Sequence, residues 1–531
     1  MRQTFPGPVR EPWLSLPWLA ARVDRVPLLR RWDRRAAYLA LGILDAAIVA
    51  ALLSSQSRGF GFMVLACAAF VLLIGMEALR PSLDRKAVLW SSIGLLIVAV
   101  VIAPLASDDV WSYAMYGHMV IHYHANPYTT SPLNFSGDVW FWRVSVWWQD
   151  TKSVYGPVFT GISAAGMLVA GNSALVARLF FQLVTAGAIA GALALLDRRG
   201  AEPGALAFLG LSPFIIIDVV NGAHNDALVG LTALVAVVML ARPLPGAGTR
   251  ALARARASSL SGAPMPALAA VASAGVLFGV GALIKLIALL PAAALFVWLW
   301  RQETPGRGES ARRAVVFAAV VGTIVALGYL CLGGPTALSP VQEASRMVDQ
   351  WSLWGWLGHL MPASPTGAGP LGGLAVLPVP KRWLTGPAQY LGTLSVVLVA
   401  LLGILAWSQD RRPSATVGAA VLAFVLVTPY IQPWYLAAML LPLAWQWRSR
   451  LALVGMCYAL ILFLADAWLN STGLWRIAFR IPLSTAYPVF QILVLAALVA
   501  LEVRALGWRR TRSAPAGPPG APGIPAGVTT A

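Results

Sequence analysis

Long uninterrupted blocks of apolar residues dominate this chain of 531 residues and restrict what it can fold into. Many of the blocks have about 17–25 residues, the length that an α-helix needs to cross the hydrocarbon core of a bilayer. The blocks are continuous rather than alternating, which argues against a membrane β-barrel. Charged residues make up only 11% of the chain, whereas soluble proteins contain about 25%. The sequence therefore predicts an all-α, polytopic membrane protein.

Hydropathy predicts roughly 13–14 transmembrane helices. We expect them to begin near Ala37, Gly61, Val88, Ala174, Leu206, Ala227, Leu268, Ile287, Val315, Ala388, Thr416, Tyr435, Leu451 and Thr485. The first external loop, which follows the third span, is itself expected to contain a helix.

Basic residues set the predicted orientation. The net charge is +18, but most basic residues lie in short loops between spans, where positive charge marks the cytoplasmic side rather than a nucleic-acid partner. Residues 1–35 are expected to form a basic cytoplasmic segment, 36–508 the transmembrane domain, and 509–531 a disordered cytoplasmic tail. The large external loops are 106–153 and 333–387. The chain is thus predicted to be a multi-pass plasma-membrane protein with both termini in the cytoplasm.

One apolar segment, Tyr155 to Ala170, does not fit this count as a full span. If it crossed the membrane, the later Arg-rich loops would all lie on the wrong side. We therefore expect a re-entrant or interfacial half-helix that opens at Tyr155-Gly156-Pro157. With this assignment, all five histidines fall in outer loops, so the polar chemistry gathers on the extracytoplasmic face.

An acidic pair, Asp108-Asp109, follows directly after the apolar run from Val88 to Leu105. Carboxylates are costly inside hydrocarbon, so a pair at its border suggests work at the membrane surface. One of the two could act as a general base. Either could instead cap the helix that begins at Val110, because Asp is a favoured N-cap residue.

The helix expected from Val110 to His124 carries His118 and His122 on one side, four residues apart. This spacing could ligate a metal if a third ligand came from elsewhere. Contact with a phosphate or sugar, and simple packing at the interface, are the alternatives. No protein-bound metal is required by the chemistry inferred below.

Other outer segments hold further candidates. The turn Asn221 to Asp226 brings His224, Asn225 and Asp226 together as hydrogen-bonding groups suited to hydroxyls. Lys285 lies alone in an apolar run and either reaches the interface or pairs with an anion. Arg346 could bind a phosphate or pair with Glu343.

A last segment of this kind opens the span that begins near Tyr435. Gln432, Trp434 and Tyr435 resemble the rim of a binding site, although a proline at a helix start is common.

Three motifs of the first external loop resemble a known family: Asp109 to Tyr113, Tyr116-Gly117-His118 and Asn126-Pro127-Tyr128. They are similar to the actinobacterial alpha-1,6-mannosyltransferases that use polyprenyl-phosphate mannose, which are membrane C-type glycosyltransferases (GT-C). The later motifs follow in the family's order: Tyr155-Gly156-Pro157, Gly222 to Asp226, and Gln432 to Tyr435.

The resemblance implies a helical fold of GT-C type with the site on the outer face, and a catalytic acidic residue that matches Asp109 or Asp108. It also extends the candidate substrate-binding residues to Tyr113, Asn126, Tyr128 and Tyr155. One position departs from the pattern, because the family often has a basic residue where this chain has His118.

The implied activity is hexosyl transfer, with mannose suggested by the resemblance. The donor would be a polyprenyl-phosphate sugar and the acceptor a lipid-anchored glycan of the cell envelope, joined by alpha-1,6 linkages. The leaving phosphate would be stabilised by Arg346, Lys285 or His118. No cofactor is required, and a divalent metal is left open. The alternatives are a transporter or flippase of a lipid-linked glycan, which would place charges near the bilayer midplane, and a non-catalytic scaffold.

Overall fold

The computed structural model describes residues 32–54, 56–105, 107–240, 267–302, 307–332, 334–344, 412–428 and 430–469. Within these ranges the regular elements are all helices, which confirms the predicted fold class.

The α-helices are α3 (Arg34–Leu53), α4 (Gln56–Leu79), α5 (Arg85–Val101), α6 (Asp109–His122), α7 (Pro157–Ala170), α8 (Ala174–Arg198), α9 (Pro203–Gly210), α10 (Asp226–Leu240), α12 (Ala267–Ile284), α13 (Leu289–Trp300), α14 (Arg307–Leu330), α15 (Ser339–Ala344), α18 (Pro413–Val427), α19 (Ala437–Ala444) and α20 (Arg450–Leu469). The shorter elements are η1 (Pro132–Phe135), η2 (Phe141–Arg143), the π-helix η3 (Phe214–Val220), η5 (Leu286–Ala288), η6 (Gly334–Leu338) and η8 (Pro433–Leu436).

The predicted spans near Ala388 and Thr485 lie outside the described residues, and every other predicted start falls inside a described helical element. Five described helices are long and apolar enough to cross a membrane: α3, the 59–79 part of α4, α8, α14 and the 451–468 part of α20. The pair α9 and η3 adds a sixth if this span, bent by 41°, is counted as one. The other apolar helices have 10–17 residues, and α12 is separated from η5 at Lys285, whose backbone is extended.

The segment expected to be a half-helix forms α7, which has 14 residues. At 1.5 Å per residue it is about 21 Å long, shorter than the roughly 30 Å hydrocarbon core. It ends at Gly171 and leads through a short turn into α8. Its length agrees with the prediction, and its orientation in the membrane stays a prediction.

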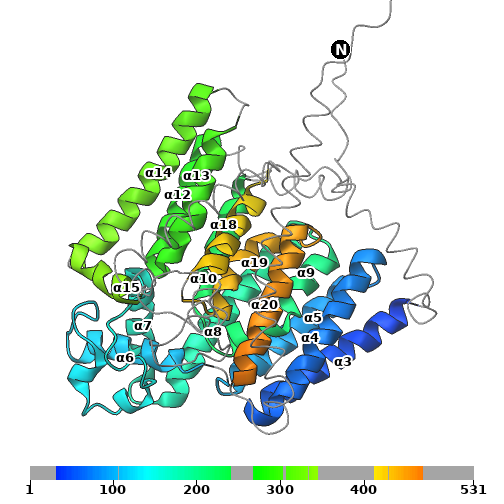
Figure 1. The fold of residues 1–531 in the computed structure, drawn as a ribbon, viewed down its shortest axis with the longest axis horizontal. Helices are drawn as coiled ribbons and strands as arrows, with labels where there is room; N and C mark the ends of the chain where they lie inside the picture. Colours follow the sequence, from blue (N-terminus) through cyan, green and yellow to red (C-terminus); the bar gives the residue numbers. More distant parts are fainter. Residues whose placement is uncertain are drawn as a thin grey trace, which may run out of the picture.

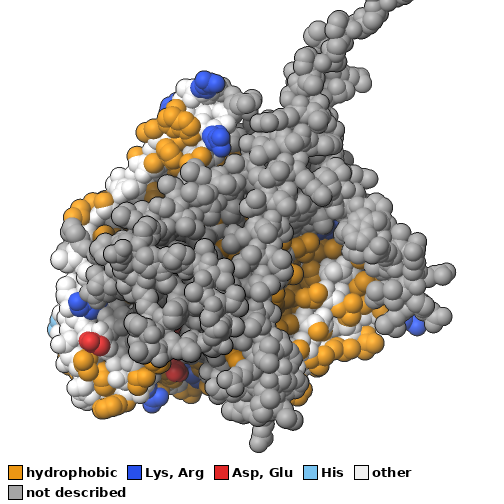
Figure 2. Space-filling model, viewed as in Figure 1, with side chains coloured by type: hydrophobic (Ala, Val, Ile, Leu, Met, Phe, Trp, Pro, Cys, Tyr) orange, Lys and Arg blue, Asp and Glu red, His pale blue; other side chains and the backbone are white. Residues whose placement is uncertain are grey.

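The helices form a continuous bundle (Figure 1), in which α3, α4 and α5 lie at one end and α12, α13 and α14 at the other. Between them α10 packs against α8, α12, α18 and α19. Large apolar side chains are exposed on the outer helices, for example Leu39, Trp90 and Leu327, each more than half exposed. In Figure 2 such side chains cover visible parts of both ends, as expected where helices face lipid.

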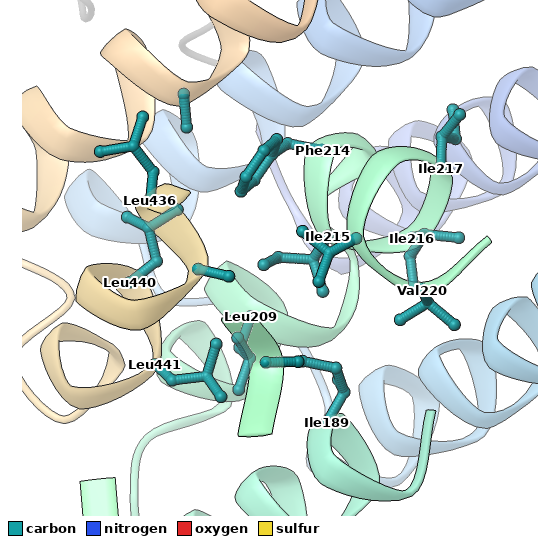
Figure 3. Packing of buried hydrophobic residues seen from close by; sticks show 14 of the residues in the cluster. Ile189, Leu209, Phe214, Ile215, Ile216, Ile217, Val220, Leu436, Leu440 and Leu441 are labelled. Carbon is teal, nitrogen blue, oxygen red and sulfur yellow. The ribbon is translucent and has the colours of Figure 1, made fainter. Parts of the chain in front are cut away.

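The best-buried part of the bundle surrounds η3, in which every residue from Phe214 to Val220 is fully buried. Figure 3 shows this π-helix beside Leu436, Leu440 and Leu441 of η8 and α19, with Leu209 and Ile189 close by. π-helical turns are rare and frequently occur at functional sites. The turn that follows η3 carries His224 and Asn225, so this packing holds them in place.

Candidate active site

The acidic pair lies where α6 begins. Asp109 is the first residue of α6, where the helix dipole favours a negative charge. Its Oδ2 lies 3.6 Å from Nδ1 of His224, and its side chain is 14% exposed. Asp108 occupies the N-cap position, but its side chain is exposed and makes no cap hydrogen bond. The Asp109 N–H instead donates to Ser107 Oγ at 3.1 Å. The structure therefore directs Asp109 into the protein and leaves Asp108 at the surface.

Partial burial and the neighbouring charge of Asp109 raise the pKa of Asp108 above its ordinary value of 3.8. The two side chains therefore differ in surroundings although they are adjacent in the sequence.

His224 faces Asp109 from the turn between η3 and α10. Its backbone N–H donates to Val219 O at 2.9 Å, and Ala223 before it has a φ of 60°. A β-carbon is uncommon at positive φ, so this tight turn is a strained feature of the kind that clusters at functional sites. The His224 ring stacks on Trp434 with centroids 3.7 Å apart and planes 9° apart. The ring is fully buried, and neither nitrogen has a hydrogen-bond partner among the described residues.

A buried ion pair adjoins this turn. Lys285 Nζ lies 2.7 Å from Asp226 Oδ2, and their side chains are 14% and 0% exposed. The ammonium also lies 4.2 Å from the ring centroid of Tyr435, a cation–π distance. Asp226 Oδ1 and both amide atoms of Asn225 are buried without a hydrogen-bond partner among the described residues. Unsatisfied buried polar groups are costly, so this cluster is an unusual feature of the fold.

Tyr113, in α6, and Tyr155, two residues before α7, form an aromatic wall beside Asp109. The ring of Tyr113 contacts Tyr155 edge to face at 5.0 Å and Phe159 at 4.8 Å. Burial raises the pKa of Tyr113 well above its ordinary value, and the charges of Asp109 and Asp226 act in the same direction. The Tyr113 hydroxyl is therefore neutral and lies within electrostatic range of both carboxylates.

Two glycines permit the close approach of this wall to its neighbours. A Cβ on Gly117 of α6 would lie 2.2 Å from the backbone oxygen of Ser163 in α7. A Cβ on Gly156 would lie equally close, at 2.2 Å, to the backbone oxygen of Leu283. The Gly156 N–H donates to Ile284 O at 2.9 Å, which fixes the start of α7 against the end of α12. Tyr155 and Lys285 are thereby held near each other.

His118 pairs with a different acidic residue, Asp138. Its Nε2 lies 3.0 Å from Asp138 Oδ2, which also accepts from the Tyr123 hydroxyl at 2.8 Å. Burial lowers the pKa of His118 below its ordinary value despite the attraction of Asp138. Its ring stacks on His122 at 4.7 Å. Among the described residues, no three His, Cys, Asp or Glu side chains are grouped as metal ligands.

Asn126 and Tyr128 hold the loop that follows α6 to the bundle. Asn126 Nδ2 donates to Leu332 O at 2.9 Å, and its Oδ1 accepts from the Tyr128 N–H at 2.9 Å. The Tyr128 hydroxyl hydrogen-bonds Thr160 at 2.8 Å, and burial raises the pKa of Tyr128 to about 12. These contacts are satisfied within the protein.

Gln432 and Arg346 are the remaining predicted site residues. Gln432 is the half-buried residue before η8, next to the stacking segment that carries Trp434. Arg346 lies outside the described residues, and so does the side chain of Glu343, its predicted alternative partner.

Asp218 and Gln182 are buried polar residues that the sequence interpretation missed. Asp218 lies in η3 with both carboxylate oxygens buried and without a hydrogen-bond partner among the described residues. It is close enough to Asp109 and Asp226 for their charges to interact. An acidic residue inside the apolar run Ile215 to Val220 is a signal that could have identified it. Gln182, in α8, hydrogen-bonds the turn that carries His224.

Comparison with known proteins places these features in a family context. Residues 31–302 match the family described as "Alpha-(1->6)-mannopyranosyltransferase, N-terminal domain". A probable alpha-(1->6)-mannopyranosyltransferase of Mycolicibacterium smegmatis is 27% identical over 83% of this chain and 78% of its own length. An alpha-(1->6)-mannopyranosyltransferase of Mycobacterium tuberculosis is 26% identical over 76% of this chain and 72% of its own length. No solved structure matches the chain.

Proposed function

Because the chain belongs to the alpha-(1->6)-mannopyranosyltransferase family, we propose that it transfers a mannosyl residue from a polyprenyl-phosphate donor to a lipid-anchored glycan acceptor. The reaction would take place on the extracytoplasmic face of the plasma membrane and form alpha-1,6 linkages in a cell-envelope mannan or lipoglycan. The observation that carries this proposal is the meeting of Asp109, of His224 and Asp226 in one turn, and of Lys285, which come from three separate segments of the chain.

Asp109 is the proposed general base. It would take the proton of an acceptor hydroxyl while the hydroxyl oxygen attacks the anomeric carbon, and such proton transfer contributes about 10²–10⁴-fold to a rate. Its neighbour His224 lies 3.6 Å away, and catalytic contacts are often this long before substrate binds. The unpartnered amide of Asn225 and the ring nitrogens of His224 are suited to the hydroxyls of the sugar.

Lys285 is the proposed partner of the leaving phosphate. The bond between the anomeric carbon and the phosphate oxygen breaks, and its electron pair leaves with the polyprenyl phosphate. Negative charge that develops there is stabilised by a cation already in place. Lys285 suits this role better than His118, because its ammonium adjoins the turn that carries His224, whereas burial lowers the pKa of His118 and so favours its neutral form. This step needs no cofactor, and transfer that persists in EDTA would support that part of the proposal.

A transfer assay with paired single variants tests the assignment. Membranes that contain the full chain would be incubated with radiolabelled polyprenyl-phosphate mannose and acceptor lipid. Asp109→Asn should lower the transfer rate by at least about 100-fold. Asp108→Asn is the matched control because this side chain is exposed, and it should keep most of the activity. Both variants should be inserted at the wild-type level.

The outcomes separate the competing functions. Wild-type transfer by Asp109→Asn would rule out Asp109 as the base. Labelled donor that crosses the bilayer intact, with no labelled glycan formed, would support the flippase alternative instead.

A further inference from the structure

The carboxyl end of α5 is held by an unusually complete set of side-chain hydrogen bonds. The last carbonyls of a helix lack partners within the helix. Here the backbone oxygens of residues 99–103 all lie within hydrogen-bond distance of side-chain donors, which come from Arg178, Gln182 and Asn221. The segment after this end leads to Asp109, so its position determines where α6 begins.

Asn221 is the central residue of this arrangement, and it is fully buried. Its Nδ2 lies 3.0 Å from Ala99 O, 3.0 Å from Ile102 O and 3.1 Å from Ala103 O. Its Oδ1 accepts from the Leu105 N–H at 2.9 Å. Because this N–H can only donate, the orientation of the amide is fixed by its partners. One side chain therefore binds both ends of the bend between α5 and the acidic pair.

The backbone of Asn221 begins the turn that carries His224. Gln182, also fully buried, strengthens the connection. Its Nε2 lies 2.9 Å from Asn221 O, 2.9 Å from Ile102 O and 3.1 Å from Ala99 O. The two amides thus join the segment that leads to Asp109 and the turn that leads to His224.

We propose that Asn221, supported by Gln182, is a positioning residue that sets the separation of Asp109 and His224. This inference rests on the proposed function for its link to catalysis, but the structural coupling can be measured without substrate. Arg178 offers a partial contrast. It hydrogen-bonds the same end of α5, at Val100, Val101 and Ile102, and it donates to Gln182 Oε1 at 2.8 Å, but it does not bond the turn itself.

Asn221→Asp is the sharpest variant. It keeps the size of the side chain and the acceptor for Leu105 N–H, but places a carboxylate oxygen against three carbonyl oxygens. In the transfer assay kcat should fall by about 10–100-fold, as expected for misplacement by about 1 Å, while KM for the donor changes by less than about threefold. Arg178→Met is the control: it removes bonds to α5 and to Gln182 Oε1 but none to Asn221 or to the turn, so it should lower thermal stability and lower kcat clearly less than Asn221→Asp does.

Hydrogen–deuterium exchange of the purified full chain provides the independent measurement. Asn221→Asp should increase exchange in residues 105–111 and 222–226 together. Arg178→Met should increase it chiefly near residue 101, and in residues 222–226 less than Asn221→Asp does. If the wild-type chain transfers no mannose but Asn221→Asp still increases exchange in both segments, the positioning role is upheld and the proposed function is rejected.

Gln182→Met is a second, milder variant with nearly the same side-chain volume, for use if Asn221→Asp does not fold. It should show the same pair of exchange changes and a smaller loss of kcat. Wild-type kcat and unchanged exchange at either segment in a folded variant would overturn the proposal. An equal loss of kcat in Arg178→Met would also overturn it, because the effect would then come from general loosening of α5.

Discussion

Substitution of Gly117 by alanine should separate α6 from α7 and disturb the site from a distance. The added Cβ would lie 2.2 Å from Ser163 O and 2.5 Å from its carbonyl carbon, whereas ordinary contact begins at 3.4 Å. Both atoms belong to the backbone, so no side-chain rotation can relieve the clash. The helices must therefore move apart by about 1 Å, and overpacking of this kind costs about 1–3 kcal/mol.

The movement of α6 should reach Asp109, two turns before Gly117, and the ring of Tyr113. A displacement of about 1 Å can cost up to about 100-fold in rate. We expect Gly117→Ala to lower mannosyl transfer by about 10–100-fold and to lower the unfolding temperature of the detergent-purified chain. Transfer would be measured with radiolabelled donor, and unfolding by a thermal ramp.

Gly161→Ala is the matched control for this prediction. Gly161 lies on the exposed face of α7, and a Cβ there would have no atom within 4 Å. Alanine inside a helix is favoured over glycine by about 0.5–1 kcal/mol, so the control should be as stable as the wild type or slightly more stable. Equal transfer rates and unfolding temperatures for the two variants would refute the close approach of α6 to α7.

Three further predictions concern charge, pH and stacking. Lys285→Met should destabilise the chain by about 3–5 kcal/mol, because it leaves Asp226 buried without its cation. The double variant with Asp226→Asn should regain stability, measured by thermal unfolding, but should not regain mannosyl transfer in the transfer assay. Burial lowers the pKa of His118 in the folded chain below its ordinary value of 6.5. Between the folded and the unfolded pKa the unfolded chain binds more protons, so stability should rise with pH up to about 6.5. His118→Gln should flatten this pH dependence in thermal unfolding, and an unchanged slope would contradict the prediction. Trp434→Leu should lower transfer by up to about 10-fold through loss of about 0.5–1.5 kcal/mol of stacking on His224, whereas Trp434→Phe should keep most of it.

The sequence predicted the positions of the apolar helices well because hydropathy is a local property, although only five or six of the described helices are long enough to span a membrane. The apolar runs at Ala174 and Leu451, for example, appear in α8 and α20. The breaks were harder to predict, because a bend such as that between α9 and η3 depends on packing against η8 and α19. In the sequence, a span that is broken in the structure therefore has the same apolar pattern as a continuous one.

Several site residues could be found from sequence because polar side chains at a membrane border are unusual. Asp109, His224 and Lys285 were identified this way, although no local pattern could show that they meet. His118 had the same sequence signal, and Asn126 was a candidate through the family resemblance, but the structure engages them with Asp138 and Leu332. Such partners, up to 206 residues away in the chain, are determined by the tertiary fold.

The main-chain hydrogen bond between Gly156 and Ile284 affects which positions can be varied when this protein is engineered. It joins backbone atoms, so exchanges of the neighbouring side chains at 155 and 285 leave the bond itself in place. Position 155 can therefore be varied in a library while the spacing between the two segments is inherited unchanged, with Lys285 kept as the partner of Asp226. A search for altered donor preference would begin at position 155, with glycine kept at 156.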